Sequence, residues 1–376
     1  MSDNSRIEEP SVAPREIPCR GGHTAELYED AAKGRRACED ELLERGVSLP
    51  LSHRTAWTSA DPTADSWFLA VRDGDGRCVC GFALQVTRSR VLAGHLLLRV
   101  EKFGAALTGE SRTAALEALV KLSHSHKRVL RVYLEVFSRD ARIREQVESD
   151  ANGLGFRRPA ARRMYADTVI VDLARDDAAM LARLGQKTRK NIRDVAAGPL
   201  EVRVITDVGY VDRMNALMRE TMARTGGRPE DQDWAAILRF ANSYPSLGRV
   251  VGTVRTDIAT PDALVAFSWG RSHGDHVEIC NTASTRIPGS KVALTYALVW
   301  NLMCWGGSIG ATWLDLGGVT AGGSGSADPL GGISDFKRAF SKTVVRVGDE
   351  WVYEPRRFRA LIASLAGRVW SRVTGR

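Results

Sequence analysis

The residues best suited to chemistry lie in the segment 313–340. A short strand there brings Asp315 close to Gly317 and Gly318, so two positions just after a carboxylate lack side chains. Glycines at a strand end let another backbone or a ligand come close. Lys337 follows after a loop rich in glycine and serine. A carboxylate, an open backbone and a lysine are the parts of a binding or catalytic site, although glycine pairs are also common in ordinary loops.

The lysine belongs to a turn that aromatic side chains can anchor. Phe336 and Phe340 are four residues apart, so they share one face of a short helix, and Lys337 lies beside them. The alternative is a capped helix whose lysine is simply solvated. Spacing alone leaves both interpretations open.

A basic helix is expected at 181–197. At about 100° per residue, Leu181, Leu184, Ile192 and Val195 line one of its faces. The cations on the broad opposite arc are Arg183, Lys187, Arg189, Lys190 and Arg193. This arc is either a solvated face or a contact surface for phosphates. The single acid among these cations favours the phosphate contact.

Both stretches resemble the Fem-type (peptidoglycan-bridge) aminoacyltransferases, a branch of the GNAT acyltransferase superfamily. The first match reads Asp-Leu-Gly-Gly, a loop, Gly-Ile, two residues and Phe-Lys-x-x-Phe. The second is the basic helix together with the strand that begins at Leu200. The two matches bracket roughly residues 178–355, whereas the first half of the chain is similar only in its layout.

The resemblance implies an α/β (α+β) fold of two tandem GNAT-like domains. Each domain would be a mixed, mostly antiparallel sheet flanked by helices. The expected division is a flexible tail at 1–20, a first domain at 21–175 and a second domain at 176–376 that carries the catalytic centre. A length of 376 residues agrees with two domains.

The resemblance also implies a reaction, in which an amino acid passes from aminoacyl-tRNA to an amine acceptor. The acceptor would be a peptidoglycan precursor or a small-molecule metabolite, and neither metal nor ATP would be needed. Phe336 and Lys337 would lie where donor and acceptor meet, because a cation beside the developing oxyanion stabilises it. Asp315 and Glu278 are the candidates for accepting a proton or orienting an ammonium, or are structural acids. His273 and His276 flank a turn and are expected on a hairpin surface.

A further loop bears on the donor. In GNAT proteins that use acyl-CoA, a loop at this place presents backbone N–H groups to the pyrophosphate at a helix N-terminus. This chain keeps Arg286 and Gly289 but has Lys291 where a small residue is expected. The departure weakens the interpretation as a CoA site, and an ordinary Pro-Gly turn explains the loop equally well.

Two alternatives therefore stay open beside the tRNA-dependent aminoacyltransferase. One is an acyl-CoA-dependent N- or O-acyltransferase that acts on an envelope polysaccharide or a metabolite. The other is a non-catalytic module that binds tRNA or a membrane on a degenerate acyltransferase scaffold. Tight binding of CoA without use of charged tRNA would indicate the CoA-dependent enzyme. The absence of transfer activity with any donor would indicate the non-catalytic module.

Charge and composition narrow the partners and the compartment. The net charge of +8 favours polyanions such as tRNA, nucleotide phosphates or an anionic membrane. Scattered cysteines, no signal-like start and no apolar run of spanning length indicate a cytoplasmic protein, with contact to the inner face of the membrane as a further option. The segment 356–376 either packs its apolar side on the core or lies on such a membrane.

The pattern of apolar residues predicts the following order of elements. In the first half we expect a helix at 24–45, strands at 68–71 and 78–86, a helix at 112–124, a strand at 129–137, a helix at 141–153 and a closing strand at 165–173. After the basic helix we expect a strand at 200–205, helices at 208–224 and 231–243, strands at 249–256, 263–271 and 277–283, a helix at 289–305, strands at 313–316 and 344–347, and a terminal helix.

Overall fold

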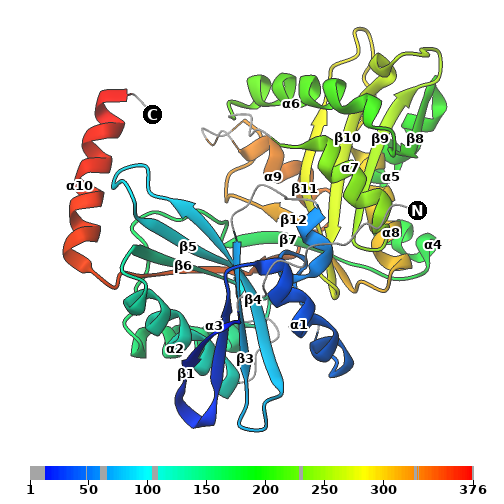
Figure 1. The fold of residues 1–376 in the computed structure, drawn as a ribbon. Coiled ribbons are helices and arrows are strands. Elements are labelled where there is room, and N and C mark those ends of the chain that lie inside the picture. The colour runs from blue at the N-terminus through cyan, green and yellow to red at the C-terminus, as the bar shows by residue number, and fades with distance from the viewer. Residues whose placement is uncertain are drawn as a thin grey trace, which may run out of the picture.

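The computed structural model describes residues 13–47, 49–59, 66–103, 109–227, 232–325, 328 and 330–374. Its strands form two seven-stranded sheets, each covered by helices, which lie side by side (Figure 1). Both sheets are mixed but mostly antiparallel, because each has one parallel pair among its described strands. This architecture agrees with the predicted fold class.

The first sheet has the strand order β1-β2-β3-β4-β5-β6-β14. Its strands are β1 (Arg15–Pro18), β2 (Thr24–Tyr28), β3 (Ser66–Arg72), β4 (Cys78–Arg88), β5 (Leu96–Phe103), β6 (Val129–Phe137) and β14 (Gly348–Tyr353). Helix α1 (Ala31–Glu44) packs on the face that carries Phe68 and Ala70. Helices α2 (Gly109–Ser125) and α3 (Ala141–Gly153) cover the opposite face, where Leu69 and Val71 point.

The second sheet has the order β13-β7-β12-β11-β10-β9-β8. Its strands are β7 (Asp167–Asp172), β8 (Leu200–Val204), β9 (Gly248–Arg255), β10 (Leu264–Ser272), β11 (His276–Ser284), β12 (Trp313–Gly318) and β13 (Val344–Arg346). Its helices are α4 (Asp177–Arg183), α5 (Gln186–Asp194), α6 (Val211–Thr225), α7 (Trp234–Ser243), α8 (Tyr296–Ser308) and α9 (Gly331–Arg338). Helix α8 lies in the core on one face, while α6 and α7 form the core on the other.

The chain crosses between the sheets twice. β7 was expected to close the first half of the chain, but it pairs with β12 and β13 in the second sheet. β14 follows α9 in sequence and pairs with β6 in the first sheet. The proposed division between residues 175 and 176 stays a prediction, and the two sheets exchange strands across it.

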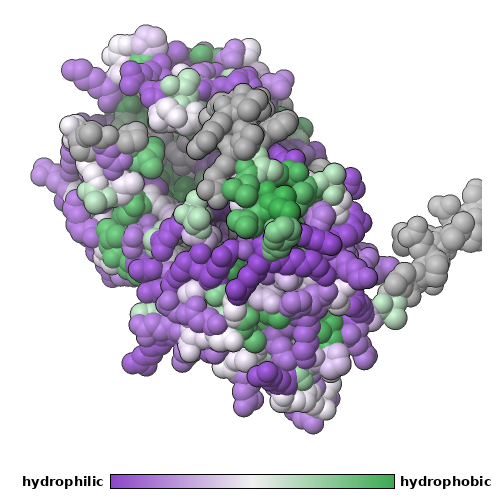
Figure 2. All heavy atoms as spheres, turned by 90° about the vertical axis from the view of Figure 1, so that its left-hand side faces the viewer, coloured by the Kyte–Doolittle hydropathy of each residue, from purple (hydrophilic) through white to green (hydrophobic). Residues whose placement is uncertain are grey.

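Helix α10 (Arg357–Thr374) follows β14 and returns to the first sheet. On the face of the molecule that carries α10, hydrophobic side chains form a large patch beside hydrophilic ones (Figure 2). Among the described residues, no helix is both long and apolar enough to cross a membrane.

Several expected element boundaries are wrong. The helix expected at 24–45 is β2 followed by α1, which begins where Asp30 accepts hydrogen bonds from two backbone N–H groups. The tail expected at 1–20 contains β1 and the first residue of a short 3₁₀ turn (Arg20–Gly22), and residues 1–12 lie outside the described residues. The helix expected at 289–305 starts later, at Tyr296, because the chain first makes a turn at Gly289, whose φ is +75°.

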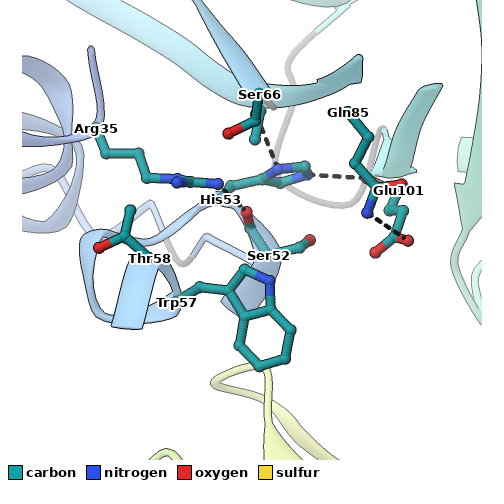
Figure 3. A pocket seen from close by; sticks show the side chains of 9 residues that line it. Arg35, Ser52, His53, Trp57, Thr58, Ser66, Gln85 and Glu101 are labelled. Atoms are coloured by element: carbon teal, nitrogen blue, oxygen red, sulfur yellow. Dashed lines mark hydrogen bonds between the residues drawn. The ribbon is translucent and has the colours of Figure 1, made fainter. Parts of the chain in front are cut away.

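A buried histidine fastens the segment 51–59 to the first sheet. The Nδ1 atom of His53 accepts a hydrogen bond from the Ala83 N–H at 3.0 Å, and its Nε2 atom lies 2.8 Å from the Glu101 carbonyl oxygen. Figure 3 shows Arg35 and Gln85 beside the imidazole at a cavity of about 20 Å³. Both ring nitrogens of His53 lie within hydrogen-bond distance of backbone groups, so His53 is a structural residue.

The burial of His53 predicts a loss of stability in acid. Burial lowers its pKa to about 3, so the folded protein holds the imidazole neutral while the unfolded chain protonates it below about pH 6.5. Its contribution to the free energy of unfolding is complete above that pH and falls by up to about 1.4 kcal/mol per pH unit as the pH drops toward 3.

Urea unfolding of the wild type and of His53→Gln, at several values between about pH 7 and about pH 4.5, measures this contribution. We expect the difference in stability between the two proteins to shrink as the pH falls. His95→Gln, at a half-buried histidine, controls for the loss of an imidazole. A difference that stays constant over this range would contradict the prediction.

Candidate active site

Asp315 is fully buried in β12 and is held by three hydrogen bonds. One carboxylate oxygen accepts from the Tyr165 hydroxyl at 2.7 Å. The other accepts from the Thr168 hydroxyl and from the Gly317 N–H, the latter at 2.7 Å. Burial, followed by the charge of Asp315, raises the pKa of Tyr165 well above its ordinary value, so this hydroxyl stays a donor. Asp315 is therefore a positioning residue that fixes the end of β12 against β7.

Gly317 and Gly318 are both approached so closely by a neighbouring side chain that a larger residue would not fit without a shift. Gly317 has φ +79°, and a Cβ built there would lie 3.2 Å from the Lys337 Nζ atom. A Cβ on Gly318 would lie 2.5 Å from the Cβ atom of Tyr165, which forces a shift. Gly317 and Gly318 thus give Lys337 and Tyr165 the space to approach the β12 backbone.

Lys337 points from α9 onto this backbone. Its Nζ atom donates to the Gly318 carbonyl oxygen at 2.6 Å. Burial lowers the pKa of Lys337 to about 8, although the nearby carboxylate of Asp315 opposes that shift. The lysine is consequently a half-buried cation near neutral pH that loses its charge in mildly alkaline solution.

The loop before α9 is tied to that helix rather than open. The Arg338 guanidinium donates to the carbonyl oxygens of Thr320 and Gly322, the latter at 3.0 Å. The Asp335 carboxylate accepts from the Ser324 N–H at 2.7 Å. These contacts hold the described part of the loop across the helix that carries Phe336 and Lys337.

A groove of about 630 Å³ lies on the Phe336 side of α9. The ring of Phe336 packs edge-on against Tyr296, with centroids 5.0 Å apart, and Tyr296 stacks on Phe340 at 5.3 Å. The basic side chains that line the groove are Arg183, Lys187, Arg338 and Lys342. Aromatic rings and cations together suit a ligand that has both rings and phosphates.

The predicted basic helix is two helices, and its cations have different surroundings. The chain leaves the helical conformation at Leu184 and Gly185. Arg189 donates to the Leu184 and Ala182 carbonyl oxygens at 2.6 and 3.1 Å, so it caps the end of α4 instead of facing solvent. Lys187 is exposed in the groove.

The remaining cations of α5 lie away from the groove lining. Lys190 pairs with Asp194 at 2.5 Å, and Arg193 is exposed. Arg286, Gly289 and Lys291 are also exposed, on a turn that ends before α8 begins at Tyr296. The backbone N–H groups of this turn are therefore separate from the helix N-terminus that the CoA interpretation requires.

Glu278 belongs to an ion cluster between the sheets. Its Oε2 atom lies 3.0 Å from Lys102 Nζ on β5, 3.2 Å from Arg271 and 2.9 Å from the His273 ring. Burial alone would raise its pKa, but Arg271 and Lys102 outweigh burial and hold it well below the ordinary value. Glu278 is thus a permanently ionised link between β5 and β11, which argues against a role as proton acceptor.

Two histidines expected on a surface hairpin are instead buried. His276 stacks on Trp313 with ring centroids 4.2 Å apart, and on His273 at 4.8 Å. They line a groove of about 440 Å³ between the sheets, together with Lys102 from β5. Within the described ranges no three His, Cys, Asp or Glu side chains gather as metal ligands.

The sequence interpretation missed Tyr165, Thr168, Lys102 and Arg338. Tyr165 and Thr168 lie about 150 residues from Asp315 along the chain, and no local pattern connects them. Arg338 could have been identified from the sequence, because it directly follows Lys337 within the Phe-Lys-x-x-Phe motif.

Replacement of Asp315 by Asn should destabilise the protein. An amide keeps one acceptor oxygen but turns the other into a donor, so a buried partner of Asp315 loses its acceptor. We expect the free energy of unfolding to fall by about 1–3 kcal/mol. Chemical denaturation of Asp315→Asn beside Asp40→Asn, an exposed position on α1, measures this loss. Equal stability of the two variants would contradict the role of Asp315 in the network.

Comparison with known proteins supports the fold. No protein-family model matches the sequence, and no curated protein matches it. The crystal structure of FemX superposes with a TM-score of 0.70 at 12% identity, over 86% of this chain and 98% of FemX. The structure of L-PGS from Bacillus licheniformis gives 0.51 at 14% identity, over 88% and 96%. The chain thus shares its fold of two helix-covered mixed sheets with FemX, and the predicted α/β (α+β) fold class is confirmed.

Proposed function

We propose that this protein is an acyltransferase that moves an amino acid from aminoacyl-tRNA to an amine. The observation that carries the proposal is the half-buried Lys337, held by Gly318 above the buried Asp315 network and adjacent to the groove of basic and aromatic residues. The fold shared with FemX supports an acyltransferase of the GNAT type. The acceptor is a peptidoglycan precursor or a small-molecule metabolite.

The groove suits the 3′ end of an RNA. Single-stranded nucleotides bind by stacking their bases on aromatic rings and by placing phosphates near cations. Phe336 and Tyr296 supply ring surfaces there, while Lys187 and Lys342 extend exposed ammonium groups. Phe336 and Lys337 are consecutive, so their Cα atoms are about 3.8 Å apart. We infer that a donor bound in the groove extends its acyl end past Phe336 toward Lys337, whose ammonium lies at the Gly318 carbonyl oxygen outside the groove lining.

The reaction needs little besides positioning and one cation. The neutral amine of the acceptor attacks the ester carbonyl carbon, a C–N bond forms, and the C–O bond to the terminal ribose breaks. The proton lost by the amine goes to the ribose oxygen that leaves. The Lys337 ammonium lowers the barrier because it stabilises the oxyanion of the tetrahedral intermediate more than the neutral ester.

A transfer assay tests the donor class. The purified protein is incubated with a pool of radiolabelled aminoacyl-tRNAs and with cell-envelope or cytosolic extract, and RNase treatment beforehand serves as the control. We expect labelled product that RNase abolishes. Tight binding of CoA or acetyl-CoA, with no use of charged tRNA, would show that the donor assignment is wrong. No transfer with any donor would favour a non-catalytic binding module.

The pKa of Lys337 predicts a pH dependence of transfer. Its charge is present below about pH 8 and is lost above it, so stabilisation of the oxyanion should decline as the pH rises through that value. Lys337→Arg keeps a positive charge over the whole range. We therefore expect the ratio of the wild-type rate to the Lys337→Arg rate to fall above about pH 8.

Protonation of the acceptor amine affects both proteins alike, so the ratio isolates the lysine. The single-turnover rate is measured with one acceptor at saturating concentration. A ratio that is flat across this pH range would contradict a role for the Lys337 charge in catalysis.

A further inference from the structure

Helix α10 packs on the first sheet through its smallest side chains. Ala360 and Ala363 are buried against Leu130 of β6. Arg131 fastens the same side of the helix, because it donates to the Ala360 carbonyl oxygen at 2.8 Å and to the Ser364 hydroxyl at 2.5 Å. The side of α10 that faces the first sheet therefore carries small side chains, and Arg131 supplies its hydrogen bonds.

The large apolar side chains of α10 point the other way. Phe358 is 75% exposed, Leu361 53%, Ile362 42% and Leu365 51%. At about 100° per residue these positions fall in one stripe about 100° wide, opposite Ala360 and Ala363. Figure 2 looks onto the side of the molecule where α10 lies and shows a hydrophobic patch there. Burial of alanine with exposure of phenylalanine and leucine reverses the usual preference and marks a surface with a partner.

Positive charge frames the stripe on both sides. Arg357 and Arg359 are exposed and lie about 100° to either side of Phe358 on the helix. The segment 355–376 contains six arginines and no Asp or Glu. Glu354, just before it, is neutralised by Arg131 at 2.8 Å. The partner should therefore be apolar where the stripe lies and anionic around it.

The neighbouring hairpin extends the same surface. Leu92, on the connection between β4 and β5, packs against the cluster that contains Ala360 and Ala363. Next to it, Val91 is 37% exposed, and Arg88 and Arg90 are exposed. Apolar and cationic side chains thus continue from α10 onto the hairpin, so the surface is broader than one helix.

We propose that α10 and the hairpin tip form a binding surface for an anionic lipid bilayer. The stripe from Phe358 to Leu365 enters the boundary between headgroups and acyl chains, and the arginines contact the phosphates. A second copy of this chain is disfavoured as the occupant, because two such faces would bring arginines against arginines. The inference rests on α10 and the neighbouring hairpin, and it is independent of the proposed acyl transfer.

Vesicle co-sedimentation of the full-length protein tests this surface. Vesicles of phosphatidylcholine alone are compared with vesicles that contain about 30% anionic phosphatidylglycerol. We expect binding to the anionic vesicles that weakens as salt is added. The triple variant Phe358→Gln/Leu361→Gln/Leu365→Gln should lower the bound fraction about tenfold, and Arg357→Gln/Arg359→Gln should lower it several-fold.

Leu43→Gln is the matched control, because Leu43 is a leucine on α1 that is 43% exposed. It should bind like the wild type, and circular dichroism should show that all variants are folded. Absence of wild-type binding to anionic vesicles, or equal binding by the triple variant, would overturn the proposal. A wild-type dimer that the triple variant makes monomeric, without vesicle binding by either protein, would assign the face to self-association instead.

Discussion

The buried carboxylate of Asp315 is the interaction on which the candidate site depends. A charge with no access to water requires donors from the protein, and here Tyr165, Thr168 and Gly317 provide them. Two of these donors come from β7 and the residues just before it, so the carboxylate joins β7 to the end of β12. The open glycine turn and its contact with Lys337 follow from this arrangement, because the β12 backbone must stay in place for the lysine to reach Gly318.

A second charge cluster explains how the two sheets hold a common geometry. Glu278 of β11 binds Lys102 of β5, and Lys102 also lies 3.6 Å from the centroid of the Phe137 ring on β6. The exchange of β7 and β14 between the sheets adds covalent links to this contact. The two sheets are therefore joined by chain connections and by ion pairs. Within the second sheet, Asp315 and Glu278 are register partners on the parallel pair of β11 and β12.

Sequence patterns predict most elements of this fold but miss strands whose buried positions are charged. β14 has buried Asp349 and Glu350. The Arg158 guanidinium donates to the Asp349 carboxylate, and the Arg163 N–H donates to the Glu350 carboxylate, both from a distant part of the chain. Hydrophobic alternation cannot identify such strands, because their burial depends on partners distant in sequence. β7 was predicted as a strand, although its place in the second sheet depends on pairing that no local pattern encodes.

In the candidate site too, residues of contiguous motifs could be predicted from the sequence, whereas contacts with residues distant in the chain could not. The Asp-Leu-Gly-Gly strand end and the Phe-Lys turn are contiguous motifs, and the sequence alone selects them. A local pattern does not predict that the hydroxyls of Tyr165 and Thr168 bind Asp315. It also does not predict that Arg189 caps α4, because that role depends on the helix break at Gly185. Glu278 was selected for its place beside Asp315, whereas its partners show it to be a structural ion.

The central claim is that the Lys337 ammonium supports acyl transfer from charged tRNA. The most direct test is the single-turnover rate of RNase-sensitive transfer by the wild type and by Lys337→Met, which keeps the apolar stem but removes the charge, with Lys33→Met as the control at an exposed lysine of α1. The account predicts a loss of about 100-fold or more for Lys337→Met and none for Lys33→Met. A folded Lys337→Met protein that transfers at the wild-type rate would contradict it.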